Sequence, residues 1–147
     1  MSDREGGGLE FDFDAYRRFI TQVQLQDIWL ASSKLENKHG PETPDQVRVA
    51  ITDTASWTKR DDGFRAMVRY AIRFKVGARM LASVEATFAA DFDSDEPMSE
   101  ELFQVFAVNN LPLNTWPYVR EFTASAVSRM GWTPFTLPVR RINVDRR

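Results

Sequence analysis

The densest set of side chains with chemical potential is the acidic run Asp91-Phe92-Asp93-Ser94-Asp95. Its alternating oxygen ligands resemble the opening of a calcium-binding loop. Such a loop needs Gly at its sixth position and a bidentate Glu at its twelfth, where this chain has Glu96 and Leu102. The pattern fails at both positions. We therefore expect a solvated acidic loop before a helix start, where the helix dipole favours negative charge.

Catalytic groups of other kinds are scarce. His39 is the only histidine and there is no cysteine, whereas a zinc site or a His-based general base needs partners of these types. The sequence contains neither a glycine-rich phosphate loop leading into a helix nor a Gly-x-Ser-x-Gly motif. We interpret His39 as an exposed loop residue. We expect no enzyme activity, no metal site and no cofactor.

Composition indicates an ordinary globular domain. The 147 residues are 43% hydrophobic and 27% charged, enough to bury a core. A net charge of −2 argues against a dominant phosphate-binding face. Residues 1–10 are polar and Gly-rich, which predicts a disordered tail before a single domain at 11–147. Because the N-terminus is acidic and no apolar run reaches membrane-spanning length, we expect a cytoplasmic protein.

Apolar residues at helical spacing predict a helix over 12–21, capped by Asp12 or Asp14. Period-two alternation then predicts strands, with a β-bulge near Gln26-Asp27 to reconcile the two halves of the first one. A loop is expected over 32–45, a turn over 59–63 and a hairpin turn over 76–79. The predicted strands span 23–30, 46–58, 64–76 and 80–90.

The strand at 64–76 has one apolar face, and its other face is basic: Arg65, Arg69, Arg73 and Lys75. Alternating basic residues can contact phosphates, but no aromatic residues interleave with them for base stacking. Carboxylates and a further cation lie where cross-strand pairing can reach the stripe, at Glu85, Asp91 and Arg48. We favour a solvated outer face and expect no nucleic-acid partner.

Two more helices follow. The first is predicted over 98–109, opened by Pro97 or capped by Ser99, and the second over 117–130, opened by Pro117 and ended by Gly131. Residues 132–138 are too apolar for a surface loop and too rich in proline for a helix or central strand. The fold expected is α+β, a four-stranded antiparallel sheet covered on one face by helices, with an extended crossover segment.

The stretch from Phe106 to Val139, roughly a quarter of the chain, resembles the SecB protein-export chaperone family. The resemblance rests on a Pro-Tyr-(Ala/Val)-Arg-Glu helix start, a helical Val-Ser-Arg and a Pro-containing apolar crossover. In this chain these are Pro117 to Glu121, Val127 to Arg129, and Trp132 to Pro138. The family continues into a C-terminal helix, whereas this chain ends at Arg147. We therefore expect a shortened C-terminus.

The resemblance implies an ATP-independent holdase that binds unfolded or aggregation-prone protein in a hydrophobic groove, assembled as a dimer or tetramer. The groove residues it implies are Phe122, Met130, Trp132, Phe135 and Leu137. The oligomer interface it implies comprises Val23, Leu25, Tyr118, Val119 and Ala126. Because the crossover is expected outside the strand core, Trp132→Ala is expected to weaken client binding and leave the fold intact.

The pathway is left open between two branches of the family. Export members dock a motor through acidic residues on the sheet, for which Asp27 and Glu85 are candidates here. Four residues after Asp27 the family pattern has Glu, where this chain has Ala31. Another branch shields the antitoxin of a toxin–antitoxin module, and the lost acidic residue fits that branch as well. The alternative function is a structural scaffold of the same fold with one dedicated protein partner.

Overall fold

The computed structural model of the chain describes residues 12–135 and 137. The tail expected at 1–10 and most of the chain beyond Phe135 lie outside these residues. The described helices and strands, in chain order, are α2 (Phe13–Gln22), β1 (Gln24–Asn37), β2 (Arg48–Arg60), β3 (Gly63–Val76), β4 (Arg79–Asp93), α3 (Glu100–Asn109) and α4 (Leu111–Arg129).

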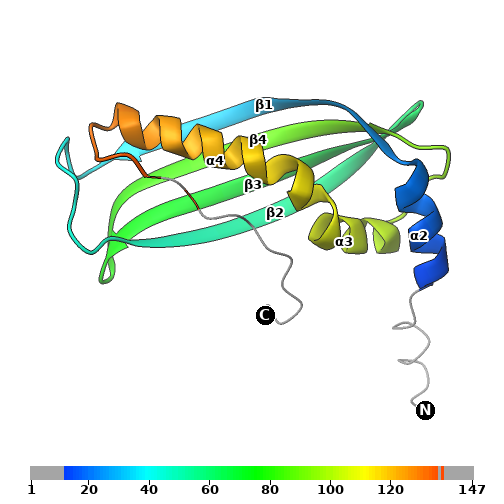
Figure 1. The fold of residues 1–147 in the computed structure, drawn as a ribbon, viewed down its shortest axis with the longest axis horizontal. Coiled ribbons are helices and arrows are strands. Elements are labelled where there is room, and N and C mark those ends of the chain that lie inside the picture. The colour runs from blue at the N-terminus through cyan, green and yellow to red at the C-terminus, as the bar shows by residue number, and fades with distance from the viewer. Residues whose placement is uncertain (1–11, 136, 138–147) are drawn as a thin grey trace, which may run out of the picture.

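The four strands form one antiparallel sheet in the order β1-β4-β3-β2, so β1 and β2 are its edges. All three helices lie on one face of the sheet (Figure 1). The α4 helix runs along the β1 and β4 side, while α2 and α3 sit at the end where β4 leads into α3. The expected α+β architecture, a four-stranded sheet covered on one face, is confirmed.

The core lies between the helices and the central strands. The even-numbered residues of β3 from Phe64 to Phe74 are buried, as the alternation predicts. At the α2 end the core is aromatic: the ring of Phe106 on α3 lies edge-on to Phe19, Phe64 and Phe92, with centroids 5.2–5.7 Å apart. Edge-to-face packing of this kind adds to the free energy of burial, so it fixes α3 against the sheet.

Strand β1 is longer than predicted. Residues 32–37 pair with β4 over Thr87 to Ala82, so the prediction of a loop from residue 32 is wrong. The predicted bulge is confirmed by a register shift between Leu25 and Asp27, and a second shift lies between Leu30 and Ser32. The polar run Ser32-Ser33-Lys34 looks like a loop in the sequence. It can form a strand because an edge strand needs few apolar residues. Backbone pairing to β4 decided its structure.

Strand β4 also differs from the prediction, at its end and in its first residues. Strand β4 continues to Asp93, beyond the predicted end at 90, and Asp91 pairs with Arg65 as a strand residue. A register shift between Phe74 and Lys75 places Met80 opposite Lys75, outside the apolar row expected for it. The predicted hairpin at Gly77 is confirmed, with φ +62° there. Cross-strand partners, which no single segment reveals, set these ends.

The long helix starts earlier than predicted. It begins at Leu111 with Pro112 in its first turn, and Pro117, the predicted opening residue, lies inside it. Between the two helices lies only Asn110, in place of the gap of seven residues between the predicted helices. A proline suits either position by its φ, so the motif alone misplaced the start.

The C-terminal end of α4 is as predicted. Gly131 has φ +87°, and its N–H donates to the carbonyl of Ser128 at 3.0 Å. The Trp132 N–H donates to the carbonyl of Val127 at 3.3 Å. This pair of bonds is a Schellman motif, which satisfies the last carbonyls of the helix and turns the chain back over the sheet. None of the helices in the described residues is long and apolar enough to cross a membrane.

Candidate chain-binding surface

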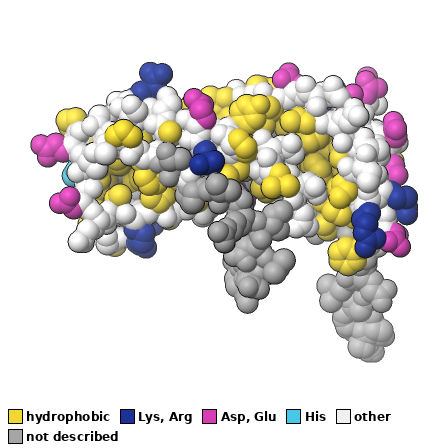
Figure 2. Space-filling view, in the orientation of Figure 1, with side chains coloured by type: hydrophobic (Ala, Val, Ile, Leu, Met, Phe, Trp, Pro, Cys, Tyr) yellow, Lys and Arg dark blue, Asp and Glu magenta, His cyan; other side chains and the backbone are white. Residues whose placement is uncertain are grey.

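An apolar seam runs between α4 and the edge strand β1. Tyr118 and Phe122 on α4 both pack on Phe88 of β4, with ring centroids 6.2 and 6.4 Å away. Leu30 of β1 is the direct cross-strand partner of Phe88. We use the term seam for Leu30, Leu35, Tyr118, Phe122, Ala126 and Met130. Hydrophobic side chains gather on this helix-covered face in Figure 2.

The seam ends in a hollow near the C-terminus of α4. The hollow has a volume of about 410 Å³ and is lined by Leu35, Pro41, Ala126 and Met130, together with Glu36 and Arg129. Apolar walls from a strand, a loop and a helix meet there, and one charge of each sign lies beside them. The site can therefore take an apolar side chain of a partner chain, with polar groups available to its backbone.

Exposure distinguishes the seam from ordinary scattered surface leucines. Leu30, Leu35 and Tyr118 are 41%, 42% and 45% exposed. Tyr118, Phe122, Ala126 and Met130 repeat every four residues on one face of α4, a row of about 18 Å at 1.5 Å per residue. Grouped apolar exposure marks an interaction surface, whereas a single exposed leucine does not.

The backbone of β1 adds a second element to this surface. It is an edge strand, so one row of its N–H and C=O groups faces no strand within the described sheet. An open edge can accept another extended chain through main-chain hydrogen bonds, with little demand on its sequence. Seam and edge together offer apolar burial beside backbone pairing.

Three predicted groove residues lie outside the seam, and two of them pack on Phe74 of β3. Trp132 is 6% exposed, its ring lies edge-on to Phe74 at 5.5 Å, and its indole N–H donates to the carbonyl of Gly40 at 2.8 Å. Phe135 is half-buried with its ring 5.8 Å from Phe74. Leu137 is buried, and its carbonyl accepts from Arg120 Nε at 2.9 Å. The premise that this segment lies outside the core is wrong for Trp132 and Leu137.

The same segment is tied to the β1–β2 loop. The Thr133 N–H and hydroxyl both bond the hydroxyl of Thr43, at 2.5 and 2.9 Å. A Cβ on Gly131 would lie 3.2 Å from Cβ of Pro41. These contacts fasten the end of α4 to the loop that leaves β1, and so they hold the two walls of the hollow in place.

The residues predicted for an oligomer interface divide by exposure. Val119 and Ala126 are buried within the protomer and Val23 packs partly against the core. Leu25 and Tyr118 are exposed. The predicted groove and interface sets therefore share one helix face, where Tyr118, Phe122, Ala126 and Met130 follow one another. Sequence reasoning missed Leu30 and Leu35. The second register shift of β1 lies between them, so simple alternation does not place them on the same face.

The candidate docking residues Asp27 and Glu85 both lie on the outer face of the sheet. The Asp27 carboxylate accepts from the Ile28 N–H at 2.9 Å. Glu85 accepts from Arg69 at 2.9 Å. The expectation that this face carries no aromatic residue is wrong, since Trp29 of β1 lies there with the guanidinium of Arg65 4.8 Å from its ring. A cation already covers that ring.

Asp91 completes the paired part of the outer face. Arg65 donates two hydrogen bonds to its carboxylate, from Nε at 2.7 Å and from Nη2 at 3.0 Å. This pairing across the strands was predicted. The hydrogen bond from Arg65 lowers the pKa of Asp91, against the opposing effect of burial. Arg60 adds a further favourable charge at 3.6 Å. The carboxylate is thus held in place, and its negative charge is balanced by the two arginines.

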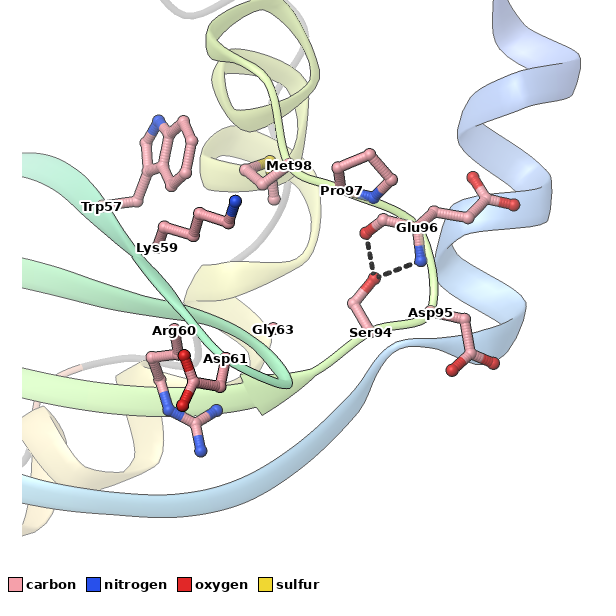
Figure 3. Close-up of a pocket in the computed structure, with 10 residues that line it drawn as sticks. All are labelled: Trp57, Lys59, Arg60, Asp61, Gly63, Ser94, Asp95, Glu96, Pro97 and Met98. Atoms are coloured by element: carbon pink, nitrogen blue, oxygen red, sulfur yellow. Dashed lines mark hydrogen bonds between the residues drawn. The ribbon is translucent and has the colours of Figure 1, made fainter.

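A separate pocket of about 250 Å³ lies where the β2–β3 turn meets the segment before α3 (Figure 3). Trp57, Met98 and Lys59 form one side of it, and the Trp57 indole N–H donates to Glu100 at 3.2 Å. The Ser94 hydroxyl donates to the carbonyl of Glu96 at 2.6 Å, so its proton is engaged in a turn. No His, Cys, Asp and Glu cluster suited to a metal occurs among the described residues.

Comparison with known proteins identifies the fold. No protein-family model matches the sequence, and no curated protein matches it. Among solved structures, the chain is similar to the SecB-like chaperone Rv1957 of Mycobacterium tuberculosis, in complex with a ChAD peptide from the antitoxin HigA1. The two share 20% identity with a TM-score of 0.72, over 83% of this chain and 93% of the other. The chain therefore has the SecB-like fold.

Proposed function

We propose that this protein is an ATP-independent chaperone that holds an unfolded or aggregation-prone chain along the seam. The observation that carries the proposal is the exposed apolar row of Leu30, Leu35 and Tyr118 beside an open strand edge. The likeness in fold to a chaperone bound to an antitoxin peptide supports it.

The physical mechanism is preferential binding. A holdase that binds the unfolded state and leaves the native state free lowers the concentration of chains able to aggregate. Burial of apolar area is non-directional, so one seam accepts many sequences. At about 3.3 Å per residue, a row of about 18 Å holds five or six residues of extended client. No catalytic residue is required, in keeping with a protein that we propose is not an enzyme.

We propose an antitoxin as the natural client, with export substrates as the second candidate. The neighbouring structure contains an antitoxin peptide, which favours the first. Docking of an export motor through acidic residues is less favoured because Glu85 is engaged by Arg69 and Ala31 carries no charge. We place this activity in the cytoplasm.

We propose a homo-oligomer, a dimer or tetramer, that uses the exposed members of the interface set, Leu25 and Tyr118. The open edge of β1 gives a second copy a strand to pair with. Because Tyr118 also belongs to the seam, assembly and client binding meet on one surface. A structural scaffold with one dedicated partner would use this same surface without general affinity for unfolded chains.

The test is aggregation of a denatured model protein diluted into buffer, followed by light scattering with stoichiometric amounts of this protein and no ATP. We expect scattering to be suppressed, and an inert protein of similar size at the same concentration should leave it unchanged. Unchanged scattering with a well-folded oligomer would reject the general holdase and favour the scaffold.

A further inference from the structure

The basic stripe on the outer face of β3 contains two kinds of cation. Arg65 and Arg69 are engaged by Asp91 and Glu85 at 2.7 and 2.9 Å. Arg73 and Lys75, the next residues along the same face, form no ion pair among the described residues. The positive charge of the stripe is therefore balanced at Arg65 and Arg69 and left unbalanced at Arg73 and Lys75.

The register explains why these two charges stay uncompensated. Arg73 lies between Ala50 on β2 and Ser83 on β4, neither of which is charged. Lys75 lies between Arg48 and Met80. Like charges directly opposite in a sheet repel one another and are destabilising. The fold thus keeps two cations face to face at Arg48 and Lys75.

Arg48 is held in this arrangement. Its guanidinium donates to the carbonyl of Gly77 in the β3–β4 turn at 3.0 Å, so the side chain reaches along the sheet past Lys75. Only some of its donors are used by that bond, because a guanidinium carries five N–H groups. The rest remain available to an acceptor on the outer face.

A basic hollow adjoins this group at the hairpin end of the sheet. It has a volume of about 570 Å³ and is lined by Lys38, His39, Arg79, Met80 and Leu81. The Lys38 N–H donates to the carbonyl of Leu81 at 2.8 Å, which fixes the start of the β1–β2 loop beside β4. We use the term basic end for Arg48, Arg73 and Lys75; Lys38 and Arg79 add positive charge at the adjoining end of the sheet.

We infer that the basic end docks an acidic segment of a partner protein. The guanidinium groups of Arg48 and Arg73 and the ammonium group of Lys75 present donors to several carboxylates at once, and charge-assisted bonds of this kind are the stronger ones. Binding would also relieve the repulsion between Arg48 and Lys75. The segment needs only closely spaced Asp or Glu residues in an extended conformation.

A protein segment fits this surface better than a nucleic acid. The free cations on the sheet lie within two rows, about 7 Å along the strands, whereas duplex binding typically neutralises about six to ten phosphates. Arg65 and Arg69, the next cations along the same face, are already engaged by Asp91 and Glu85 and leave little positive charge for a longer polyanion. The aromatic ring on this face, Trp29, is covered by Arg65 and offers no stacking platform.

The basic end is separate from the seam. Arg73 and Lys75 lie on the outer face of the sheet, opposite the face that carries α4 (Figure 1). An acidic partner can therefore bind while a client occupies the seam. The protein would act as an adaptor between an unfolded chain and a second protein, which goes beyond the proposed chaperone function.

Binding of a fluorescently labelled acidic peptide tests this inference. The probe alternates Glu and Ser over about ten residues, enough to span the patch at about 3.3 Å per residue. We expect fluorescence anisotropy to show saturable binding that weakens as salt rises. In the double variant Arg73→Glu/Lys75→Glu the affinity should fall by at least about tenfold.

The matched control is Arg18→Glu/Lys59→Glu, which changes the net charge equally with two exposed residues at the opposite end of the sheet. It should retain peptide affinity within about twofold, since exposed charges beyond a Debye length are screened. The melting temperature of the test variant should not fall, because Glu at position 75 would face Arg48. That readout separates lost binding from lost folding.

Three results would overturn the inference. The first is no peptide binding at low salt, and the second is equal loss in the test and control variants. The third is tighter binding of a short DNA duplex than of the peptide, which would assign the patch to nucleic acid. A change in sedimentation of the test variant without any peptide binding would instead assign the patch to contacts between copies of this chain.

Discussion

At the scale of single residues, Trp132 joins three parts of the molecule. Its indole bonds Gly40 in the β1–β2 loop, its ring packs on Phe74 of β3, and its N–H completes the end of α4. Removing it opens a cavity and frees the loop. Client binding through this residue would therefore be inseparable from the integrity of the fold.

We predict that Trp132→Ala lowers the free energy of unfolding by about 3 to 5 kcal/mol, as for other buried aromatic residues. Urea denaturation followed by circular dichroism measures the loss. The control Leu113→Ala removes a side chain that is 57% exposed on α4 and should cost less than about 1 kcal/mol. Equal stability of the Trp132→Ala variant and the wild type would show that this segment is peripheral.

Asp91 gives a prediction about pH. Its pKa is lowered from 3.8 by the hydrogen bond from Arg65, so the ion pair stabilises the fold above that value. The contribution is lost as pH falls through the lower pKa of the folded state. The difference in unfolding free energy between wild type and Asp91→Asn should be constant at neutral pH and shrink in acid.

Chemical denaturation at a series of pH values measures that difference. The control is Asp61→Asn, because Asp61 has no ion pair among the described residues and its variant should follow the wild type throughout. A gap for Asp91→Asn that stays constant into acid would mean that Arg65 does not stabilise the ionised carboxylate.

At the scale of elements, α4 carries a proline in its interior. Pro117 has no N–H to give to the carbonyl of Leu113, and its side chain is exposed. Pro112 in the first turn removes a donor that a helix start does not need, and its side chain is buried. The same residue type therefore has opposite consequences at the two positions.

We predict that Pro117→Ala raises the free energy of unfolding by about 1 to 3 kcal/mol, since it restores a helical hydrogen bond. Pro112→Ala should give no gain, because it removes a buried ring and frees no useful donor. Urea denaturation of both variants makes the comparison. Destabilisation by Pro117→Ala would show that the proline ring itself packs against something essential.

The elements also show how far sequence reasoning reaches. Strand β3 and the turn at Gly77 followed from alternation and turn chemistry, and Asp12 and Ser99 cap their helices as their types suggest. The end of β1, the end of β4 and the start of α4 did not follow. Those boundaries depend on partners distant in sequence: Thr87 to Ala82 for β1, and Arg65 for Asp91.

The candidate site was predicted only in part. Phe122 and Met130, which the resemblance implied as groove residues, lie on the seam. Leu30 and Leu35 could not be assigned, because a register shift between them changes the parity of the strand. Trp132 looked like an exposed apolar residue in a proline-rich segment, and its burial comes from Gly40 and Phe74, which are remote in the chain.

At the scale of the whole molecule, the helix-covered face and the outer face have different characters. One carries the exposed apolar seam beside an open strand edge, and the other carries paired charges that give way to the basic end. An unfolded client and the acidic segment of a second protein would thus use opposite sides. This separation would let a small protein bind both without competition.

The central claim is that an unfolded chain binds the seam, and Tyr118 with Leu113 supplies a matched pair to test it. Both are exposed apolar residues of α4, 45% and 57%, but Leu113 lies about 140° around the helix from Tyr118. Each would be replaced by Glu, so both variants gain the same side chain and charge in the same helix. Only the helix face that carries the change differs.

The decisive measurement is the affinity of each variant for a labelled, permanently unfolded protein, read by fluorescence anisotropy with the oligomeric state checked by sedimentation. We predict that Tyr118→Glu weakens binding by about tenfold or more, since burying a carboxylate in an apolar site is costly. Leu113→Glu should bind like the wild type. Equal affinities of the two variants, in the same oligomeric state, would contradict the account.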